Sequence, residues 1–363
     1  MLISRLREGA HPGLNPLLSI VVPARNESAS IGQTIAALTR QSYRNLEIIV
    51  VNDQSTDDTE GIVRAIASAD ARVTLIDGQP TPEGWLGKPW ALYQGSDRAR
   101  GALLLFVDAD ILYAPGAVAA GLAFQEERGA QMVSFFPELE LRGFWENVLL
   151  TQFVMVVFVL FPSWLSNLTT KESLGIGGGT GNLITRQAYD RIGGHAALRR
   201  AIVDDVGLSR LARRHGFRSL VVRADGLIRL RIYDGLRAIV TGFEKNTSAV
   251  FGNSIVAVAV VCALTAVFHL WPYALSIVAV SQWLTDAPVS VVARLGLVTV
   301  GVITILRLVV FSSLGYSILT AIFAYPLSLG VWMFIIARSA VVTRGRSVSW
   351  RGRTFRGGSA FGD

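Results

Sequence analysis

Short apolar runs alternate with helical patterns through the first 135 residues. Four runs read as strands, because they are short, rich in large apolar residues and bounded by polar turn residues. They are Leu17–Val22, Leu46–Val51, Val73–Ile76 and Ala102–Val107. Helical patterns at Ser30–Gln41 and Thr56–Ala69 separate the first three runs. This alternation predicts an α/β fold with a doubly wound, mostly parallel sheet.

Long charge-free stretches dominate the C-terminal third of the chain. Asn246–Thr285 carries no formal charge apart from His269, and Leu308–Ala337 is a second such run. Each exceeds the ~20 residues that cross a bilayer. Val289–Leu306 is a third stretch, with Arg294 and Arg307 near its ends, where long side chains can snorkel to the interface.

Two proline pairs mark breaks or kinks within these stretches, namely Trp271-Pro272 and Tyr325-Pro326. Counted one by one, these three stretches predict three membrane spans. An odd number would place the arginine-rich tail on the outer face, against the positive-inside tendency. We therefore expect two to four spans over residues 248–340.

Composition supports a membrane-anchored protein and sets its surroundings. The 363 residues are 51% hydrophobic and only 17% charged, and the net charge is +7. Arginines cluster beside the apolar stretches and in the tail, which favours anionic lipid headgroups over nucleic acid as partners. The single cysteine, Cys262, excludes an internal disulfide. Residues 1–16 carry charges and no apolar core, so we expect no cleavable signal and a cytoplasmic N-terminal half.

Acidic residues follow the predicted strands, where parallel sheets bind their ligands. Asp108-Ala109-Asp110 comes after the fourth strand, and its paired carboxylates suit a hard divalent cation such as Mg or Mn. Such a cation can bridge a nucleotide diphosphate. A solvated turn is the alternative, since Asp is common in turns. Asp53 follows the second strand and can accept hydrogen bonds from a nucleobase, or stabilise its own turn.

A further acidic pair, Asp204-Asp205, opens a helical pattern that ends in basic residues. We expect Asp204 to cap this helix. Asp205 is the candidate general base, because inverting sugar transfer needs a carboxylate to take the proton of the acceptor hydroxyl. In the turn after the second predicted strand, Thr56 or Asp57 can cap the helix that follows Asp53.

Two glycine-containing segments complete the set of candidate features. Gly84–Trp90 holds Lys88 between glycine and proline, which can aim an ammonium group at a phosphate; a surface turn is the alternative. Gly175–Asn182 lacks the lysine and hydroxyl ending of a P-loop. We interpret it as a backbone loop that lets a substrate approach closely.

These motifs, in this order, resemble family 2 of the inverting glycosyltransferases over about residues 17–250. The matching segments are Val21–Glu27, Asn52-Asp53 with Ser55–Asp57, Asp108–Asp110 and Asp204–Leu208. The segment Gly84–Trp90, the run Tyr233–Asn246 and the tail Trp350–Arg353 resemble the hopene-associated and carotenoid branch, and ceramide glucosyltransferases more distantly.

The resemblance implies a GT-A fold, a UDP-sugar donor and a lipid-like acceptor. It places Pro23, Ala24, Glu27 and Asp53 around the nucleoside, and Lys88 near the diphosphate. It also implies Asp108 at the ribose or metal, Asp110 on Mg or Mn, and Asp205 as base. Relatives carry a Gln/Arg-x-x-Arg-Trp motif where this chain has Arg229–Tyr233, so Arg231 is the residue expected at the diphosphate and processive synthesis is disfavoured.

The segment Val148–Leu165 is long enough to cross a membrane, and its hydropathy alone favours a transmembrane helix. One crossing would, however, separate Asp110 from Asp205 by a bilayer. We therefore expect an interfacial or re-entrant helix beside the acceptor, since Gln152 interrupts the apolar run and Phe161–Trp164 supplies a break.

Together these features predict four parts: an N-terminal segment (1–16), a cytoplasmic catalytic domain (17–247), a transmembrane region (248–340) and a basic tail (341–363). The expected activity is transfer of a single sugar from a nucleotide-sugar to a lipid at the cytoplasmic face of the inner membrane. The rival classes are a processive polysaccharide synthase, a nucleotidyltransferase and a non-catalytic membrane scaffold. The sequence leaves the sugar, the lipid and the oligomeric state open.

Overall fold

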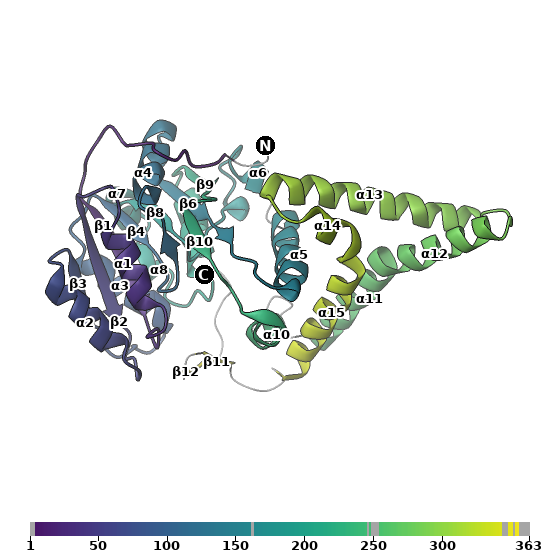
Figure 1. The fold of residues 1–363 in the computed structure, drawn as a ribbon. Coiled ribbons are helices and arrows are strands. Elements are labelled where there is room, and N and C mark those ends of the chain that lie inside the picture. Colours follow the sequence, from purple (N-terminus) through teal and green to yellow (C-terminus); the bar gives the residue numbers. More distant parts are fainter. Residues whose placement is uncertain are drawn as a thin grey trace. The chain divides into compact units, whose positions relative to one another are not determined.

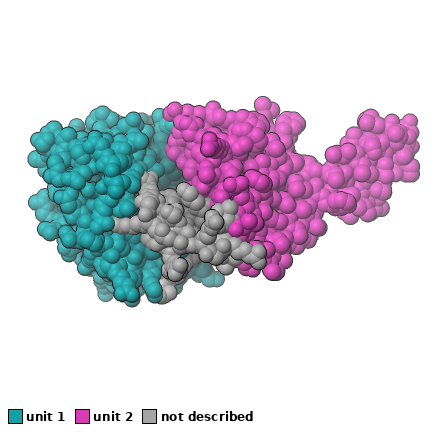
Figure 2. All heavy atoms as spheres, turned by 90° about the horizontal axis from the view of Figure 1, so that it is seen from below, with its two compact units in different colours: residues 1–140, 161–230, 357–363 teal, residues 141–160, 231–356 magenta. Residues whose placement is uncertain are grey.

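A computed structural model describes residues 4–160, 163–244, 247, 254–342, 348–350 and 353–355. The chain forms two compact units (Figure 2). Unit 1 comprises residues 1–140, 161–230 and 357–363, and unit 2 comprises residues 141–160 and 231–356. The chain thus leaves unit 1 twice.

A seven-stranded sheet forms the centre of unit 1, in the order β3-β2-β1-β4-β8-β6-β9. Only β8 runs antiparallel to its neighbours, β4 and β6. The strands are β1 (Leu18–Ala24), β2 (Leu46–Asn52), β3 (Val73–Asp77), β4 (Leu103–Phe106), β6 (Met132–Phe136), β8 (Asn182–Thr185) and β9 (Ser219–Arg223). A small second sheet joins β5 (Leu112–Tyr113), β10 (Ile228–Leu230) and β7 (Glu138–Leu139).

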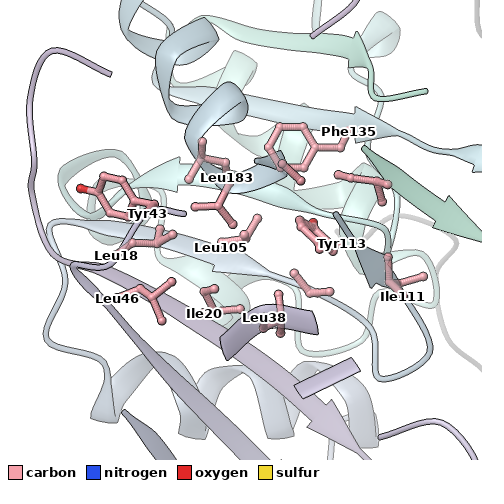
Figure 3. Close-up of a cluster of buried hydrophobic side chains, with 14 of the residues drawn as sticks. Leu18, Ile20, Leu38, Tyr43, Leu46, Leu105, Ile111, Tyr113, Phe135 and Leu183 are labelled. Carbon is pink, nitrogen blue, oxygen red and sulfur yellow. The ribbon is translucent and has the colours of Figure 1, made fainter. Parts of the chain in front are cut away.

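Helices cover both faces of the large sheet, because its strands alternate buried side chains between two cores (Figure 1). One core joins the sheet to α1, α2 and α4, and Figure 3 shows Leu18, Leu38 and Leu105 within it. The other joins the sheet to α3, α7 and α9. The helices of unit 1 are α1 (Ile31–Thr39), α2 (Thr59–Ala69), α3 (Gly87–Arg98), α4 (Ala117–Arg128), α6 (Ser163–Ser166), a 3-10 turn (Glu172–Leu174), α7 (Arg186–Arg191), α8 (Gly194–Ala197) and α9 (Asp204–Arg214).

The structure confirms the predicted α/β architecture. The four predicted strands correspond to β1 to β4, and the two predicted helices to α1 and α2. The Gly84–Trp90 segment was not predicted as a helix, yet Gly87-Lys88-Pro89 forms the first turn of α3. Proline is tolerated there because the amides of a first helical turn have no partner inside the helix.

Unit 2 consists mainly of apolar helices. They are α5 (Phe144–Leu160), α10 (Gly235–Glu244), α11 (Ile255–Thr265), a π-helical turn (Ala266–Leu270), α12 (Trp271–Leu284), α13 (Val291–Leu314), α14 (Ile318–Phe323) and α15 (Tyr325–Val342), followed by the strand pair β11 (Val348–Trp350) and β12 (Arg353–Phe355). Within the described residues, Ile255–Leu284 and Val291–Leu314 are long and apolar enough to cross a membrane. Trp271 and Tyr325 both stand at helix junctions, as the proline pairs predict.

The predicted charge-free span Leu308–Ala337 is not a single helix. Helix α13 continues to Leu314 and ends at Gly315, whose φ of +75° is a left-handed C-cap that favours glycine. The rest of the predicted span lies in α14 and α15. Charge pattern alone placed the boundary at Arg307, although the helix continues to Leu314 and ends at Gly315.

Arg307 does not snorkel, so that prediction is wrong. Its side chain is 1% exposed inside unit 2. The Nε donates to the carbonyl of Ala321 at 2.9 Å, and an Nη donates to Gln152 Oε1 at 2.5 Å. The guanidinium also lies 4.7 Å from the ring of Phe311 and 4.3 Å from that of Tyr325. Neutral oxygens and aromatic faces thus replace water around this cation.

Helix α5 covers most of the segment Val148–Leu165, and residues 161–162 of that segment lie outside the described chain. It packs on α10, α13 and α15 within unit 2. Gln152 does not interrupt the helix; it is 4% exposed and accepts the hydrogen bond from Arg307. The strands before and after α5 belong to one sheet, because β6 pairs with both β8 and β9.

The predicted boundaries at residues 16, 247 and 340 stay predictions. Arg344, Arg346, Arg351, Gly352 and Arg356 of the basic tail lie outside the described residues, as do Lys245 and Asn246.

Candidate active site

The loops that follow β1 and β2 are joined by hydrogen bonds at the carboxyl edge of the sheet. Arg25 donates to the carbonyls of Asp53, at 2.6 Å, and Gln54, at 3.1 Å. The amide of Thr56 donates to Asn26 Oδ1 at 2.7 Å. Asn26 and Gln54 have φ angles of +53° and +56°, which non-glycine residues seldom adopt and which occur often at binding sites.

This arrangement gathers four of the residues predicted around the nucleoside. Pro23 and Ala24 end β1, where they pair with Val51 and Asn52 of β2. The Glu27 amide donates to Thr59 Oγ1 at 2.8 Å. Asp53 is 5% exposed, and its amide donates to the carbonyl of Ala24 at 2.8 Å.

Lys88 lies between two carboxylates at the first turn of α3. Its Nζ is 2.8 Å from Asp108 Oδ1 and 3.6 Å from Asp204 Oδ1. Asp108 follows β4, the neighbour of β1, while Asp204 begins α9. The fold therefore brings three predicted site features to one place from positions 88, 108 and 204–205.

The acidic pair is oriented differently from the prediction. Asp204 does not cap α9: the N-cap is Val203, no side chain caps the helix, and Asp204 is buried beside Lys88. Asp205 is half-buried, and its Oδ1 accepts the amide of Val206 at 2.7 Å. The assignment of Asp204 as a cap was wrong because capping propensity takes no account of Lys88, which is distant in the sequence but 3.6 Å away in the fold. The N-cap of α2 is Asp58 rather than Thr56 or Asp57, and it makes no side-chain cap bond; Asp57, one residue earlier, accepts the amide of Thr59 at 3.1 Å.

The electrostatics of this cluster follow from burial and proximity. Burial raises the pKa of Asp204 and of Asp205, the carboxylate of Asp108 adds to the rise, and Lys88 opposes it. Although burial opposes the change, Asp108, Asp204 and Asp205 raise the pKa of Lys88. Lys88 therefore stays charged, and the raised pKa of Asp205 brings that carboxyl closer to the range useful for a general base at neutral pH.

The glycine-rich loop before β8 contacts both acidic motifs. A Cβ on Gly179 would lie 1.9 Å from Asp108 Oδ2, and one on Gly177 would lie 2.1 Å from the carbonyl oxygen of Asp205. The Asp108 amide also donates to the carbonyl of Gly179 at 2.8 Å. The groups that lie directly beside this loop are the Asp108 carboxylate and the Asp205 carbonyl. The close approach of a substrate to the loop stays a prediction. The loop packs between Asp108 and Asp205.

A histidine that the sequence analysis overlooked lies behind Asp204. His195 is 1% exposed, and its Nε2 is 3.9 Å from Asp204 Oδ2. Its Nδ1 is 2.9 Å from the hydroxyl of Tyr189. Burial and the charge of Lys88 lower the pKa of His195 to about 3. The only sequence signal was the pair Gly193-Gly194 before it.

Two carboxylates, those of Asp108 and Asp110, could contribute oxygen ligands to a divalent cation. Asp108 faces a positive charge already, and Asp110 is exposed two residues later in the same turn. Among the described residues, no group of three His, Cys, Asp or Glu side chains could hold a metal ion. Two carboxylates fit Mg or Mn when substrate phosphates supply further ligands.

Arg231 belongs to unit 2, where its guanidinium donates to Glu146 Oε1 at 3.1 Å and Asp234 Oδ1 at 2.7 Å. These two carboxylates neutralise its charge there. Its predicted contact with the diphosphate stays a prediction.

Comparison with known proteins gives the class. The family model for glycosyl transferase family 2 matches residues 19–207, which is more than half of the chain. The chain therefore belongs to glycosyl transferase family 2, a class of glycosyltransferases. The structure is similar over 90% of both chains to the mannosyltransferase PcManGT from Pyrobaculum calidifontis, solved in complex with GDP-Man and Mn2+, with a TM-score of 0.52 and 19% identity. That likeness supports the GT-A fold.

Among curated proteins, the chain is similar to 4,4'-diaponeurosporenoate glycosyltransferases of Staphylococcus aureus. The enzymes of strains MRSA252 and USA300 are each 26% identical over 245 residues. These matches cover 65% of this chain and 62% of the relatives, so the chain matches less than two thirds of their length.

Proposed function

We propose that this protein transfers a single sugar, with inversion, from a UDP-sugar to a lipid-like acceptor at the cytoplasmic face of a membrane. The observation that carries the proposal is the meeting of Lys88, Asp108 and the Asp204-Asp205 pair at the carboxyl edge of the sheet. Family membership supports sugar transfer in particular.

The two joined loops hold the nucleoside in this proposal. Pro23, Ala24 and Glu27 line it from β1, and the buried carboxylate of Asp53 accepts hydrogen bonds from the base. A carboxylate acceptor matches the N–H edge of a pyrimidine such as uracil.

Transfer then depends on charge at the diphosphate and on one proton transfer. Lys88 binds the diphosphate, and Arg231 is expected to assist it. Asp108 and Asp110 would hold Mg or Mn, which when bound neutralises charge on the departing nucleotide. Asp205 takes the proton of the acceptor hydroxyl as its oxygen attacks the anomeric carbon, and the bond from that carbon to the diphosphate breaks.

An apolar acceptor fits the rest of the chain. Among the described residues, two helices are long and apolar enough to span a membrane, and curated relatives are named for a carotenoid acid. We propose a carotenoid-like or other polyisoprenoid-type lipid as acceptor. Single-sugar transfer rather than polymer synthesis is favoured because Arg229–Tyr233 departs from the motif of processive relatives.

Helix α5 lies in or dips into the membrane surface without crossing it. The strands on both sides of α5 share one sheet, so its two ends must return to the same face of the membrane.

The activity can be tested directly. The full-length protein in detergent is incubated with radiolabelled UDP-, GDP- and TDP-sugars, Mn2+ or Mg2+, and a total lipid extract with added carotenoid acids and alcohols. We expect one labelled lipid carrying one sugar, made from a UDP-sugar, and no transfer in excess EDTA. A labelled polymer would favour a processive synthase, and no labelled product with any donor would favour a scaffold.

The topology has its own test. Cysteines replace the exposed residues Phe144 and Leu168, on either side of α5, in a Cys262→Ser background. Both should react with a membrane-impermeant thiol reagent from the same side of oriented vesicles. Reaction from opposite sides would contradict a non-crossing α5. Sites within the helix, such as Val156→Cys, should be shielded.

A further inference from the structure

A series of buried polar side chains leads from Asp204 through His195 and Tyr189 to Ser96. The hydroxyls of Ser96 and Tyr189 are 2.9 Å apart, and the Tyr189 hydroxyl is 2.9 Å from His195 Nδ1. His195 then faces Asp204, whose other oxygen faces Lys88. Apart from Asp204 and Lys88, none of these groups has a role in the proposed chemistry.

The local fold is built to place this histidine. Gly194 has a φ of +51°, and a Cβ there would lie 2.4 Å from the ring of Tyr189. The tight turn lets the His195 amide donate to the Tyr189 hydroxyl at 3.1 Å while the imidazole packs edge-on against Phe106 at 4.6 Å. Two contacts on the ring and one on the backbone thus fix its orientation.

A neutral imidazole in this position carries one proton. If Tyr189 donates to Nδ1, the proton is on Nε2, which points at Asp204 Oδ2. An N–H directed at one carboxylate oxygen turns the other oxygen toward Lys88. At 3.9 Å this is an electrostatic contact, of the kind that tightens when a ligand completes the site.

Asp108 and Asp204 have different consequences for Lys88. Asp108 is partly exposed and is a proposed metal ligand, so its charge is shared once a cation binds. Asp204 is buried at 4% exposure and is not a metal ligand in the proposed function. It is therefore the partner that can keep the ammonium group in place while the donor binds.

We propose that His195 is a positioning residue which, through Asp204, holds the ammonium group of Lys88 where the donor diphosphate binds. This inference rests on the proposed function. It predicts that the loss of the imidazole weakens donor binding and leaves the acceptor side unaffected, because the effect passes through Lys88 alone.

The test compares variants of the full-length protein in detergent. His195→Phe keeps a ring and removes the N–H group, His195→Gln restores a donor and an acceptor, and Tyr189→Phe removes the partner of Nδ1. His215→Gln, at an exposed histidine of the same unit, is the matched control. Calorimetric Kd values for UDP with Mn2+, KM values for donor and acceptor, and the Tm are measured.

We expect His195→Phe to raise the Kd for UDP and the donor KM about threefold, because a neutral N–H group 3.9 Å from a carboxylate contributes less than a full hydrogen bond to a charged group. The acceptor KM should change less than about twofold. Tyr189→Phe should act in the same direction but less, while His195→Gln and His215→Gln should stay near wild type.

A double-mutant cycle separates positioning from general damage. In a Lys88→Met background, His195→Phe should cause no further loss of UDP binding, because its effect needs the ammonium group. Additive losses, an equal rise in acceptor KM, or wild-type donor binding in His195→Phe would each overturn the inference. Failure of the wild-type protein to bind UDP or GDP would instead overturn the proposed function, and this inference with it.

Discussion

Lys88 in unit 1 meets three carboxylates, whereas Arg307 in unit 2 is surrounded by carbonyl and amide oxygens and two aromatic rings. Both are cations in protected places, but their surroundings differ in kind. A lysine between carboxylates can exchange partners when an anionic ligand or a cation arrives. An arginine whose donors are taken up by neutral groups, with no described carboxylate in ion-pair range, has little to exchange.

The comparison separates a charge used for chemistry from a charge used for structure. Burying Arg307 costs desolvation, which its hydrogen bonds and ring contacts offset. In return it connects α13, through Gln152, to α5 and, through Ala321, to α14. The comparison predicts that changes around Lys88 lower turnover at constant stability, and that changes around Arg307 do the reverse.

The largest expected effect is in unit 1. Asp205→Asn keeps the size of the side chain and its hydrogen bond to Val206 but removes the proton acceptor. Turnover should fall about 10²- to 10⁴-fold, the usual contribution of a general base, with an unchanged Tm and Kd for UDP. Asp190→Asn, at an exposed position of the same unit, is the control. Near wild-type turnover of Asp205→Asn would remove Asp205 from the chemistry.

The glycine-rich loop should give the next largest effect. Gly177→Ala places a methyl group 2.1 Å from the carbonyl oxygen of Asp205, so the backbone must move. A shift near 1 Å at a catalytic group can cost about 100-fold in turnover. Gly178→Ala meets only Thr180 Oγ1, at 3.6 Å, and should be nearly neutral. Equal turnover of the two variants would show that the loop does not position Asp205.

Unit 2 should respond in stability. Gln152→Leu leaves the Arg307 guanidinium without its amide partner, and should lower the free energy of unfolding in detergent by about 1.5–3 kcal/mol. The Kd for UDP should not change. Gln282→Leu, at a half-buried glutamine of α12 that accepts the amide of Ser290 and no buried cation, is the comparison and should cost less. A Tm equal to wild type would mean that Gln152 is dispensable to the cation.

The smallest expected effect comes from the two aspartates at the start of α2, Asp57 and Asp58. Hydrogen bonds from Thr59 and Ser28 lower the pKa of Asp57 although partial burial opposes this. A lowered pKa in the folded state stabilises the protein above the ordinary carboxyl pKa of about 4, and this stability is lost as the pH falls below it. Asp57→Ala should therefore cost about 1 kcal/mol at pH 7.

Asp58→Ala, at the adjacent residue without a side-chain cap bond, should cost less at pH 7. The Tm difference between the two variants should shrink as the pH falls below about 4, because the unfolded chain then binds a proton that the folded Asp57 carboxylate resists. A difference independent of pH would assign the effect of Asp57 to something other than its charge.

The sequence was most informative where a pattern is local. Strand runs such as Leu46–Val51 and the acidic residues after them predicted the sheet and its ligand-binding edge, because strand period and turn chemistry act over a few residues. The assignments that failed depend on distant partners. Asp204 looks like a cap until α3 brings Lys88 beside it, and Arg307 looks like an interfacial residue until α5 brings Gln152.

His195 illustrates the same limit. Apart from the pair Gly193-Gly194, nothing near it in the sequence indicates a site, and only the folding of α8 against α9 and Phe106 places its ring beside Asp204. The Gly175–Asn182 loop was recognised as special, but its partners, Asp108 and Asp205, are set by the fold.

Helix α5 has a consequence for synthesis of the protein. The ribosome completes it roughly 180 residues before the end of α15, one of the helices it packs on, which corresponds to about 10–40 s of translation. Until α10, α13 and α15 have all been made, its apolar surface lacks part of its protein partners. Early delivery of the nascent chain to a membrane would cover that surface, so insertion and folding would have to proceed together rather than in sequence.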